Sequence, residues 1–242
     1  MFHISYLMPY ISHPTSSKNF AIIVAGGSGS RMQSAVPKQF LLLKGKPVLM
    51  HTIEAFHHSD ARPQIIVVLH PSYHADWAKL CAGHNFTIPH QLVKGGETRF
   101  DSVKNGLDII PDNIDALIAV HDAVRPLTSE AIINGSYKHA QEYGNAIAAV
   151  KSRDSVRQLR NGNSESLLRD EIYMVQTPQT FRSSQIKAAY LQLYDPKFTD
   201  DASVVQETGE KINLIEGSHQ NIKITFPEDL AIAELLIGIV HS

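Results

Sequence analysis

A glycine-rich, basic loop follows the first apolar run of the sequence. In AIIVAGGSGSRMQSAVPKQF (residues 21–40), β-branched residues are followed by glycines and serines, and then by Arg31 and Lys38. Glycines allow backbone N–H groups to approach an anion closely, and the two cations add positive charge to the same loop. This combination favours binding of a triphosphate. A tight connection between a strand and a helix, with its basic side chains in solvent, is the alternative.

Two common phosphate-binding motifs do not fit this loop. No Gly-Lys-Ser/Thr sequence closes it, as a Walker A motif would require. Met32 stands where the dinucleotide-binding fingerprint needs a third small residue, and the apolar run at 64–70 ends without the acid that would hold a ribose. These departures disfavour a nicotinamide-dependent oxidoreductase.

A second candidate group lies in VHDAVRP (120–126), where an apolar run ends on Asp122 and is followed by Arg125. Ligands of open parallel sheets bind beyond the carboxyl ends of the strands. Mg²⁺ prefers one or two carboxylates together with phosphate oxygens. Asp122 is therefore a candidate ligand of Mg²⁺, and a helix cap or turn residue is the alternative. We expect His121 to be a hydrogen-bonded packing residue.

Two further stretches complete the set of candidate residues. GGETRFDSV (95–103) places a glycine pair before a helix that carries Arg99 and Ser102, which can offer backbone and hydroxyl groups to a base or a ribose. NIKITFPED (221–229) places Lys223 on a short strand before the last helix. Together, the four stretches predict a site for a nucleotide and a metal ion, without an obvious nucleophile.

Alternating apolar segments must position these residues. Short β-branched runs predict strands buried on both faces, which is typical of parallel sheets; they cover 20–25, 64–70, 116–122 and 145–150. The segments between them have the apolar spacing of helices, at 47–59, 71–83, 98–110 and 128–144. This alternation predicts an α/β fold, a three-layer sandwich with a mostly parallel sheet.

The pattern changes near Lys151. Short, polar, alternating pieces continue to Tyr173 and predict a β-hairpin that leaves the main sheet. Such an arm, at about 151–175, buries little of its own surface and often packs on a partner subunit. A last helix is expected from Pro227. We expect residues 1–19 to be an extension without fixed structure and 20–242 to form a single domain.

The composition excludes several classes of partner. Of the 242 residues, 43% are hydrophobic and 19% are charged, and the net charge is −2. This balance predicts no nucleic-acid partner. No apolar run approaches the ~20 residues that span a bilayer, so we expect no membrane association and a cytoplasmic location. Cys81 is the only cysteine, which excludes an intramolecular disulfide and a cysteine-rich zinc site.

Taken in order, the motifs resemble a known family. AGGSGSRM, PKQF, GGETRFDSV, VHDAVRP, QTPQTF, TDDAS and NIKITFPEDL are similar to the motifs of the 2-C-methyl-D-erythritol 4-phosphate cytidylyltransferases of the non-mevalonate isoprenoid pathway. The resemblance extends from about Ala21 to Leu236. It implies a homodimer with a Rossmann-like fold of the nucleotide-diphospho-sugar transferase type and a protruding β-arm. It also implies Mg²⁺ as cofactor and CTP and methylerythritol phosphate as substrates.

The resemblance implies a role for each matching residue. Arg31, Lys38 and Lys223 would be catalytic, and Asp122 would bind both Mg²⁺ and substrate. The cytosine site would be lined by Ala25, Gly26, Gly27, Gly96 and Ser102. The other substrate-binding residues would be Gly29, Arg125, Thr177, Thr199 and Thr225, with Ser155 and Arg169 contributed by the neighbour's arm to hold the sugar phosphate.

The implied reaction suits these residue types. A phosphate monoester oxygen attacks the α-phosphorus of CTP in line, so no covalent enzyme intermediate is needed. Its second pKa of about 6 makes this nucleophile anionic near neutral pH without a general base. Ribitol-5-phosphate cytidylyltransferases share most of the motifs and are the nearest alternative. A non-catalytic nucleotide-binding protein is the remote one.

Overall fold

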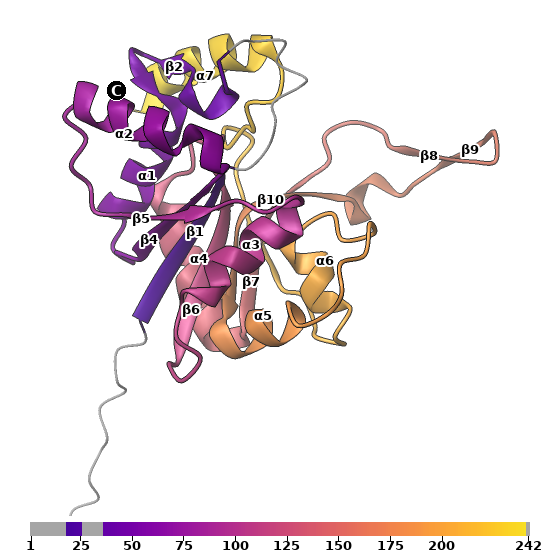
Figure 1. Ribbon diagram of the computed structural model, residues 1–242. Coiled ribbons are helices and arrows are strands. Elements are labelled where there is room, and N and C mark those ends of the chain that lie inside the picture. The colour runs from indigo at the N-terminus through magenta and orange to yellow at the C-terminus, as the bar shows by residue number, and fades with distance from the viewer. Residues whose placement is uncertain (1–17, 26–35, 241–242) are drawn as a thin grey trace, which may run out of the picture.

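A seven-stranded sheet forms the centre of the structure, a computed structural model that describes residues 18–25 and 36–240 (Figure 1). Its strand order is β11-β7-β10-β6-β1-β4-β5. Four of its six strand pairs are parallel, and only β10 runs antiparallel to its neighbours. The strands are β1 (Lys18–Ala25), β4 (Gln64–Leu69), β5 (Gln91–Lys94), β6 (Ala116–Asp122), β7 (Asn145–Lys151), β10 (Tyr173–Arg182) and β11 (Leu214–Glu216).

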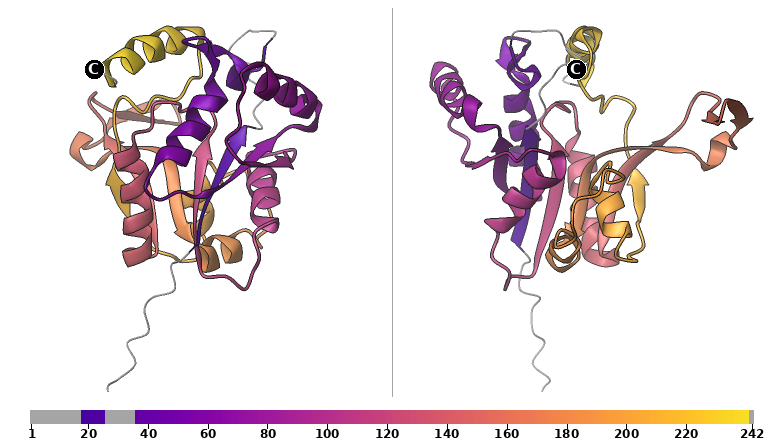
Figure 2. Two further views of the ribbon diagram at one scale, coloured as in Figure 1. Left: turned by 90° about the vertical axis from the view of Figure 1, so that its left-hand side faces the viewer. Right: turned by 45° about the vertical axis from the view of Figure 1, so that its right-hand side comes forward.

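Helices cover both faces of this sheet (Figure 2). Side chains of α1, α2 and α4 pack on one face, and side chains of α3, α5 and α6 pack on the other. The predicted three-layer α/β sandwich is therefore confirmed. The helices are α1 (Val48–His58), α2 (His74–Gly83), α3 (Arg99–Asp108), α4 (Glu130–Tyr143), α5 (Ser183–Ala189), α6 (Asp201–Gln206) and α7 (Pro227–Val240), with short 3-10 turns η2 (Lys38–Phe40), η3 (Pro71–Tyr73) and η4 (Arg169–Glu171).

Local capping sets where the helices begin. At α3, the Thr98 side chain accepts a hydrogen bond from the Asp101 N–H, and the Asp101 carboxylate accepts one from the Thr98 N–H. This reciprocal arrangement satisfies two otherwise unpaired donors of the first turn. At α4 the Ser129 side chain accepts a hydrogen bond from the Ile132 N–H without a reciprocal bond, and Gly144 ends that helix with a φ of 95°, a conformation that glycine adopts readily.

The four strands predicted from β-branched runs are all present, with small shifts of their ends, whereas the short strand predicted around Lys223 is absent. β1 begins at Lys18, two residues before the predicted start, and β6 spans the predicted residues 116–122. All seven residues of β6 are buried, as expected for a central strand. The sequence analysis did not predict β5, β10 or β11. β5 and β11 are short and partly exposed, and β10 is interrupted by a register shift between Val175 and Gln179.

α7 lies outside the three layers, next to a small two-stranded sheet of β2 (Leu42–Leu43) and β3 (Lys46–Pro47) (Figure 1). It begins at Pro227, as predicted. Its first turn is fixed by the Asp229 carboxylate, which accepts hydrogen bonds from the N–H groups of Thr225 and Phe226. A buried cluster that includes Leu43, Ile224 and Ala233 joins α7 to this part of the chain.

A long arm connects β7 with β10 and projects away from the sheet (Figure 1). Its outer part is a hairpin of β8 (Arg157–Arg160) and β9 (Asn163–Ser166). The arm leaves the sheet where Lys151 of β7 pairs with Tyr173 of β10, which agrees with the predicted excursion.

No helix of the described residues is long and apolar enough to cross a membrane.

Candidate functional site

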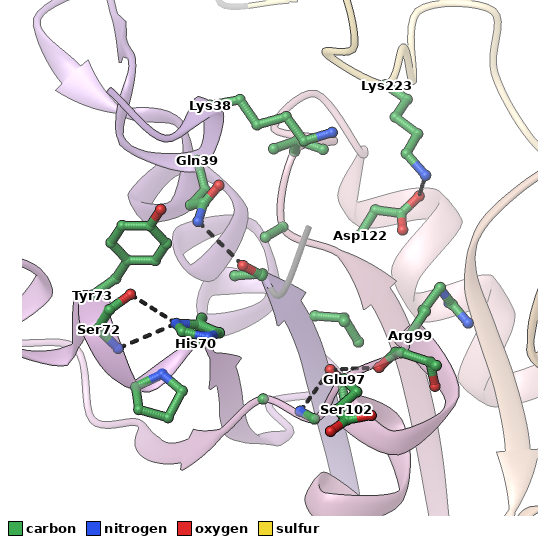
Figure 3. A pocket seen from close by; sticks show the side chains of 18 residues that line it. Lys38, Gln39, His70, Ser72, Tyr73, Glu97, Arg99, Ser102, Asp122 and Lys223 are labelled. Carbon is green, nitrogen blue, oxygen red and sulfur yellow. Dashed lines mark hydrogen bonds and ion pairs between the residues drawn. The ribbon is translucent and has the colours of Figure 1, made fainter. Parts of the chain in front are cut away.

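A pocket of about 770 Å³ opens at the carboxyl ends of β1, β4 and β6 (Figure 3). This is the edge at which open parallel sheets bind ligands. One side of the pocket carries charged residues, and the opposite side carries the loop after β4 and the glycine pair before α3. The lining residues that matter below are Ala25, Lys38, Gln39, His70, Ser72, Tyr73, Gly96, Arg99, Ser102, Asp122 and Lys223.

Asp122 is the charged centre of the pocket. It ends β6, is 8% exposed, and its Oδ2 atom lies 3.0 Å from Lys223 Nζ and 3.2 Å from Arg125 Nε. Burial alone would raise the pKa of this carboxyl group, but the positive charges of Lys223, Arg99 and Arg125 together hold it well below its usual range. Asp122 is therefore an ionised carboxylate. It does not cap α4, which Ser129 caps, but its carbonyl accepts a hydrogen bond from the Arg125 N–H as in a turn.

Arg99 is a further cation of the pocket wall. Its guanidinium forms a two-pronged ion pair with the fully buried carboxylate of Asp201, with N···O distances of 3.0 and 2.5 Å. The Tyr190 hydroxyl donates a hydrogen bond to the same carboxylate at 2.6 Å. A bidentate pair of this kind fixes the orientation of the guanidinium plane. Arg99 thus joins α3 to the first turn of α6 and keeps a charge beside the pocket.

The glycine pair before α3 allows a very close loop. A Cβ atom at Gly96 would lie 2.3 Å from Asp101 Cβ, so only glycine fits there. The Gly96 N–H donates to Ser102 Oγ at 3.1 Å, and the Ser102 hydroxyl donates to the Thr98 carbonyl at 2.9 Å. Ser102 therefore holds this loop closed from inside, at the wall of the pocket.

Lys38 reaches the pocket from η2. The neighbouring Gln39 is 1% exposed, and its Nε2 atom donates to the Ala25 carbonyl at 3.2 Å. This bond ties η2 to the end of β1, so Ala25 and Lys38 lie at the same pocket. Gly26, Gly27, Gly29 and Arg31, which the sequence analysis assigned to the same loop, lie outside the described residues.

Arg125 and Thr177, two of the predicted substrate-binding residues, do not line the pocket but contact Asp122. Arg125 is 8% exposed, forms the ion pair with Asp122, and donates from Nη1 to the Asn221 carbonyl at 2.7 Å. Thr177 is 4% exposed, and its Oγ1 accepts a hydrogen bond from the Asp122 N–H at 3.1 Å. Arg125 therefore contacts the carboxylate of Asp122, and Thr177 holds its backbone.

The remaining predicted residues lie apart from the pocket lining. Ser155 and Arg169 are exposed on the arm. Thr199 is exposed just before the capping residue of α6, and the Thr225 hydroxyl donates to the carbonyl of Lys223. Within one chain, the described residues thus bring together Ala25, Lys38, Gly96, Ser102, Asp122 and Lys223.

His121 is a packing residue, as the sequence predicted. It is fully buried, lies edge-on against Phe56, and its Nε2 atom is 3.3 Å from both the Arg125 carbonyl and Thr128 Oγ1. Burial lowers the pKa of His121 to about 4, so its ring is neutral near pH 7. Across residues 18–25 and 36–240, no group of three or more His, Cys, Asp or Glu side chains could hold a metal ion by itself.

The sequence analysis missed several residues of the site. His70 and Ser72 form one wall, with His70 Nδ1 2.7 Å from Ser72 Oγ. His70 follows β4, so the strand-end rule applied to Asp122 could have identified it. Asp201 and Tyr190 had no such signal, because their partner Arg99 is distant in sequence.

The fold and this pocket define a class: a Rossmann-like α/β protein with a pocket at the carboxyl edge of its sheet, lined by Lys38, Arg99 and Lys223. Residues 20–238 match the family described as IspD, 2-C-methyl-D-erythritol 4-phosphate cytidylyltransferase. The chain belongs to this family. Membership favours nucleotidyl transfer over the other enzyme class that the sequence analysis considered.

Relatives and solved structures agree with this assignment. The chain is 49% identical to the 2-C-methyl-D-erythritol 4-phosphate cytidylyltransferase of Azobacteroides pseudotrichonymphae, over 91% of this chain and 99% of the relative. It is 47% identical to that of Bacteroides thetaiotaomicron, over 91% of this chain and 100% of the relative. Among solved structures, the Francisella tularensis enzyme of the same name is 31% identical to this chain, with a TM-score of 0.75. The match covers 91% of this chain and 100% of that structure's chain.

Proposed function

We propose that this protein transfers CMP from CTP to 2-C-methyl-D-erythritol 4-phosphate, giving CDP-methylerythritol and pyrophosphate. Family membership and the names of the relatives support this reaction. The observation that carries it is the Asp122–Lys223 ion pair, 3.0 Å across, in a pocket that Lys38 also lines. A carboxylate and positioned cations at a sheet edge are the groups that phosphoryl transfer needs.

The chemistry requires charge control more than proton transfer. An oxygen of the acceptor phosphate attacks the α-phosphorus of CTP, the bond to the bridging oxygen breaks, and pyrophosphate leaves with the bonding electrons. Lys38 and Lys223 would stabilise the charge that grows on the phosphate oxygens. Arg99 and Arg125 would keep the site positive while Asp122 holds Lys223 in place. The glycine loop at Gly96 would accept the cytosine base.

We propose Mg²⁺ as the cofactor, with Asp122 as its protein ligand. Asp122 is an ionised carboxylate at the pocket, and the contacts from Lys223 and Arg125 both fall on its Oδ2 atom. Mg²⁺ commonly binds through one or two carboxylates and completes its shell with phosphate oxygens and waters. The donor set fits this mode. When bound, the ion would neutralise charge on the phosphates of CTP.

We propose a homodimer in which the arm meets the neighbouring chain. The arm exposes Leu159, Leu168 and Met174 to 72%, 65% and 55%, which favours burial against a partner. Ser155 and Arg169 lie on the arm, away from their own chain's pocket lining, so a neighbour's pocket is the site that they would serve. A cytoplasmic location stays a prediction of the sequence.

One assay tests the reaction and the acceptor together. Release of pyrophosphate is measured with CTP and Mg²⁺ in the presence of methylerythritol phosphate or of ribitol 5-phosphate. We expect rapid release with the first acceptor and little with the second. Preference for ribitol 5-phosphate would reassign the substrate, and no release with either acceptor would refute the proposed function.

A further inference from the structure

Lys223 needs a support, because its own segment has no regular secondary structure. Residues 217–226 form neither helix nor strand between β11 and α7, so the prediction that Lys223 lies on a short strand is wrong. Even so, Lys223 Nζ lies 3.0 Å from Asp122 Oδ2, with 40% of the lysine side chain exposed. Contacts with other parts of the same chain must therefore fix the backbone on both sides of Lys223.

Asn221 fixes the segment two residues before Lys223. It is fully buried, and its Oδ1 atom accepts a hydrogen bond from Thr128 Oγ1 at 2.7 Å. Its Nδ2 atom donates to the Thr177 carbonyl at 2.9 Å and to Gln176 Oε1 at 3.3 Å. Both ends of the amide are thus used, and each contacts a different element of the fold.

The same residue also reaches the groups that support Asp122. The Asn221 carbonyl accepts from Arg125 Nη1 at 2.7 Å, and Arg125 Nε pairs with Asp122. Thr177, whose carbonyl binds the Asn221 amide, accepts a hydrogen bond from the Asp122 N–H. On the far side of Lys223, the Ile224 N–H donates to the Val124 carbonyl at 2.9 Å. Asn221 therefore contacts two groups that support Asp122 and also anchors the segment that carries Lys223.

We propose that Asn221 is a positioning residue, which holds Lys223 in register with Asp122 and with the reacting phosphate. This inference rests on the proposed function. Rates of preorganised reactions fall steeply when a charged group moves by about 1 Å. Loss of the Asn221 amide should therefore slow turnover more than it weakens CTP binding, because Lys223 itself is still present.

Asn221→Ser and its matched control Asn145→Ser test the proposal. Asn145 is also fully buried. Its Nδ2 atom donates a hydrogen bond to the Lys211 carbonyl, and its Oδ1 atom accepts one from the Asn213 N–H, at 2.8 Å each. Unlike Asn221, it lies at the edge of the sheet opposite to the pocket. We expect Asn221→Ser to lower kcat by about 10- to 100-fold with KM for CTP within about twofold. Asn145→Ser should keep kcat within about twofold while losing comparable thermal stability.

A double-mutant cycle separates positioning from mere support of the fold. In a Lys223→Ala background, Asn221→Ser should cost less than about twofold in kcat, because the group that it positions is gone. If the two losses multiply, or if Asn221→Ser leaves kcat unchanged, the proposal is wrong. Should Asn221→Ser fail to fold, Thr128→Val removes only the hydroxyl that orients the amide, and the same cycle applies with an expected loss of about 3- to 10-fold.

A crystal structure of Asn221→Ser gives a readout without activity. We expect the Lys223 Nζ to Asp122 Oδ2 distance to exceed 4 Å while the Ile224–Val124 bond persists; an unchanged ion pair would overturn the proposal. If the parent enzyme releases no pyrophosphate with either acceptor, the proposed function fails on its own, and this structural comparison still decides whether Asn221 positions Lys223.

Discussion

At Asp122, one carboxylate is surrounded by more positive charge than it can neutralise. Lys223 and Arg125 touch it, and the nearby positive charge of Arg99 in the pocket wall also acts on it. The excess positive charge suits a pocket that must accept two anionic substrates, since it offsets their mutual repulsion. The ion pairs also keep the cations ordered before any substrate arrives.

The two pocket lysines should matter more for turnover than for binding. Lys38→Ala and Lys223→Ala each remove a cation where charge develops in the transition state, so kcat should fall by ~10²–10³. Calorimetric CTP binding should weaken much less. Lys94→Ala, an exposed lysine at the end of β5, serves as the control for lysine removal. Parental kcat in both pocket variants would contradict the proposed chemistry.

Asp122→Asn tests the metal ligand. A neutral amide is a poorer ligand for a hard cation, so the variant should need more Mg²⁺ for half-maximal activity. Activity is titrated with Mg²⁺ at saturating CTP for the parent and the variant. Superimposed titrations would mean that Asp122 only orders its cations. A thermal melt without Mg²⁺ distinguishes a weakened site from a variant that is unfolded.

His51 in α1 gives a test of how the stability of the fold depends on pH. Burial lowers the pKa of His51 below the usual 6.5, while its Nε2 atom lies 2.8 Å from the Leu43 carbonyl. The unfolded chain therefore takes up this proton at higher pH than the folded chain, so stability falls as the pH drops through 6.5. His51→Gln should reduce that fall, by at most about 1.4 kcal/mol per pH unit.

Urea unfolding between pH 7.5 and 5 measures this slope. The comparison uses the difference between variant and parent, because the chain contains twelve other histidines. His58→Gln, at an exposed position of the same helix, controls for the substitution itself. Parallel profiles for the parent and His51→Gln would show that His51 is no more buried in solution than His58.

At the scale of elements, the packing of α3 on the sheet depends on a glycine. A Cβ atom at Gly106 would lie 2.8 Å from Ile22 Cγ2 and 3.1 Å from Val68 Cγ2, both on buried strands. Overpacking of a core typically costs about 1–3 kcal/mol, against a gain in helix propensity of about 1 kcal/mol. We expect Gly106→Ala to lower the free energy of unfolding by up to about 2 kcal/mol.

Gly135→Ala is the matched control in α4. A Cβ atom there meets no atom within 4 Å, so only the propensity gain remains. This variant should be about 0.5–1 kcal/mol more stable than the parent. Denaturant unfolding of both variants measures the two effects. Stabilisation by both alanines would show that α3 can move away from β1 and β4 at little cost.

The helices and strands predicted from the sequence are those whose apolar residues fall where the structure buries them. β6 and β7 are continuous apolar runs, and α3 and α4 carry caps and apolar spacing, so each was predicted within two residues. β10 was missed because its polar residues serve tertiary contacts: Gln179 donates to Asp200 and accepts from the Ala202 N–H. Such partners lie far away in sequence, and no periodicity reports them.

The candidate site follows the same rule. Asp122 could be predicted because a carboxylate at the end of a buried strand has few structural reasons to be there. Asn221 and Asp201 lie within the quoted motifs NIKITFPEDL and TDDAS, but their roles could not be predicted, because those roles depend on what the residues contact. The pairing of Lys223 with Asp122, about a hundred residues away in sequence, is likewise a product of the fold.

At the scale of the whole molecule, a mixing experiment tests the proposed shared site. If each pocket combines Lys38 of one chain with Arg169 of the other, Lys38→Ala and Arg169→Ala homodimers should both be nearly inactive. When the two are unfolded together and refolded in equal amounts, about half the dimers should be mixed, each with one intact site. Activity should then recover to about a quarter of the parental value.

Sizing chromatography must first show that the refolded mixture is dimeric. If Arg169 served its own chain's pocket, every site would retain one defect and no activity would return. A dimeric mixture as inactive as its components would therefore refute the shared site. Arg182→Ala, at the exposed end of β10 and away from the arm, controls for general loss of arginine.

The pairing of Lys151 with Tyr173 makes the arm an enlarged hairpin turn. The strands on either side of it are neighbours in the sheet, so residues 152–172 are a single continuous insertion that the core does not need for its chain path. Evolution or an engineer can lengthen, shorten or exchange this insertion in one stretch of gene while the strands that carry the pocket stay as they are. The arm is therefore a single segment that can be exchanged without changing the order of the strands in the sheet.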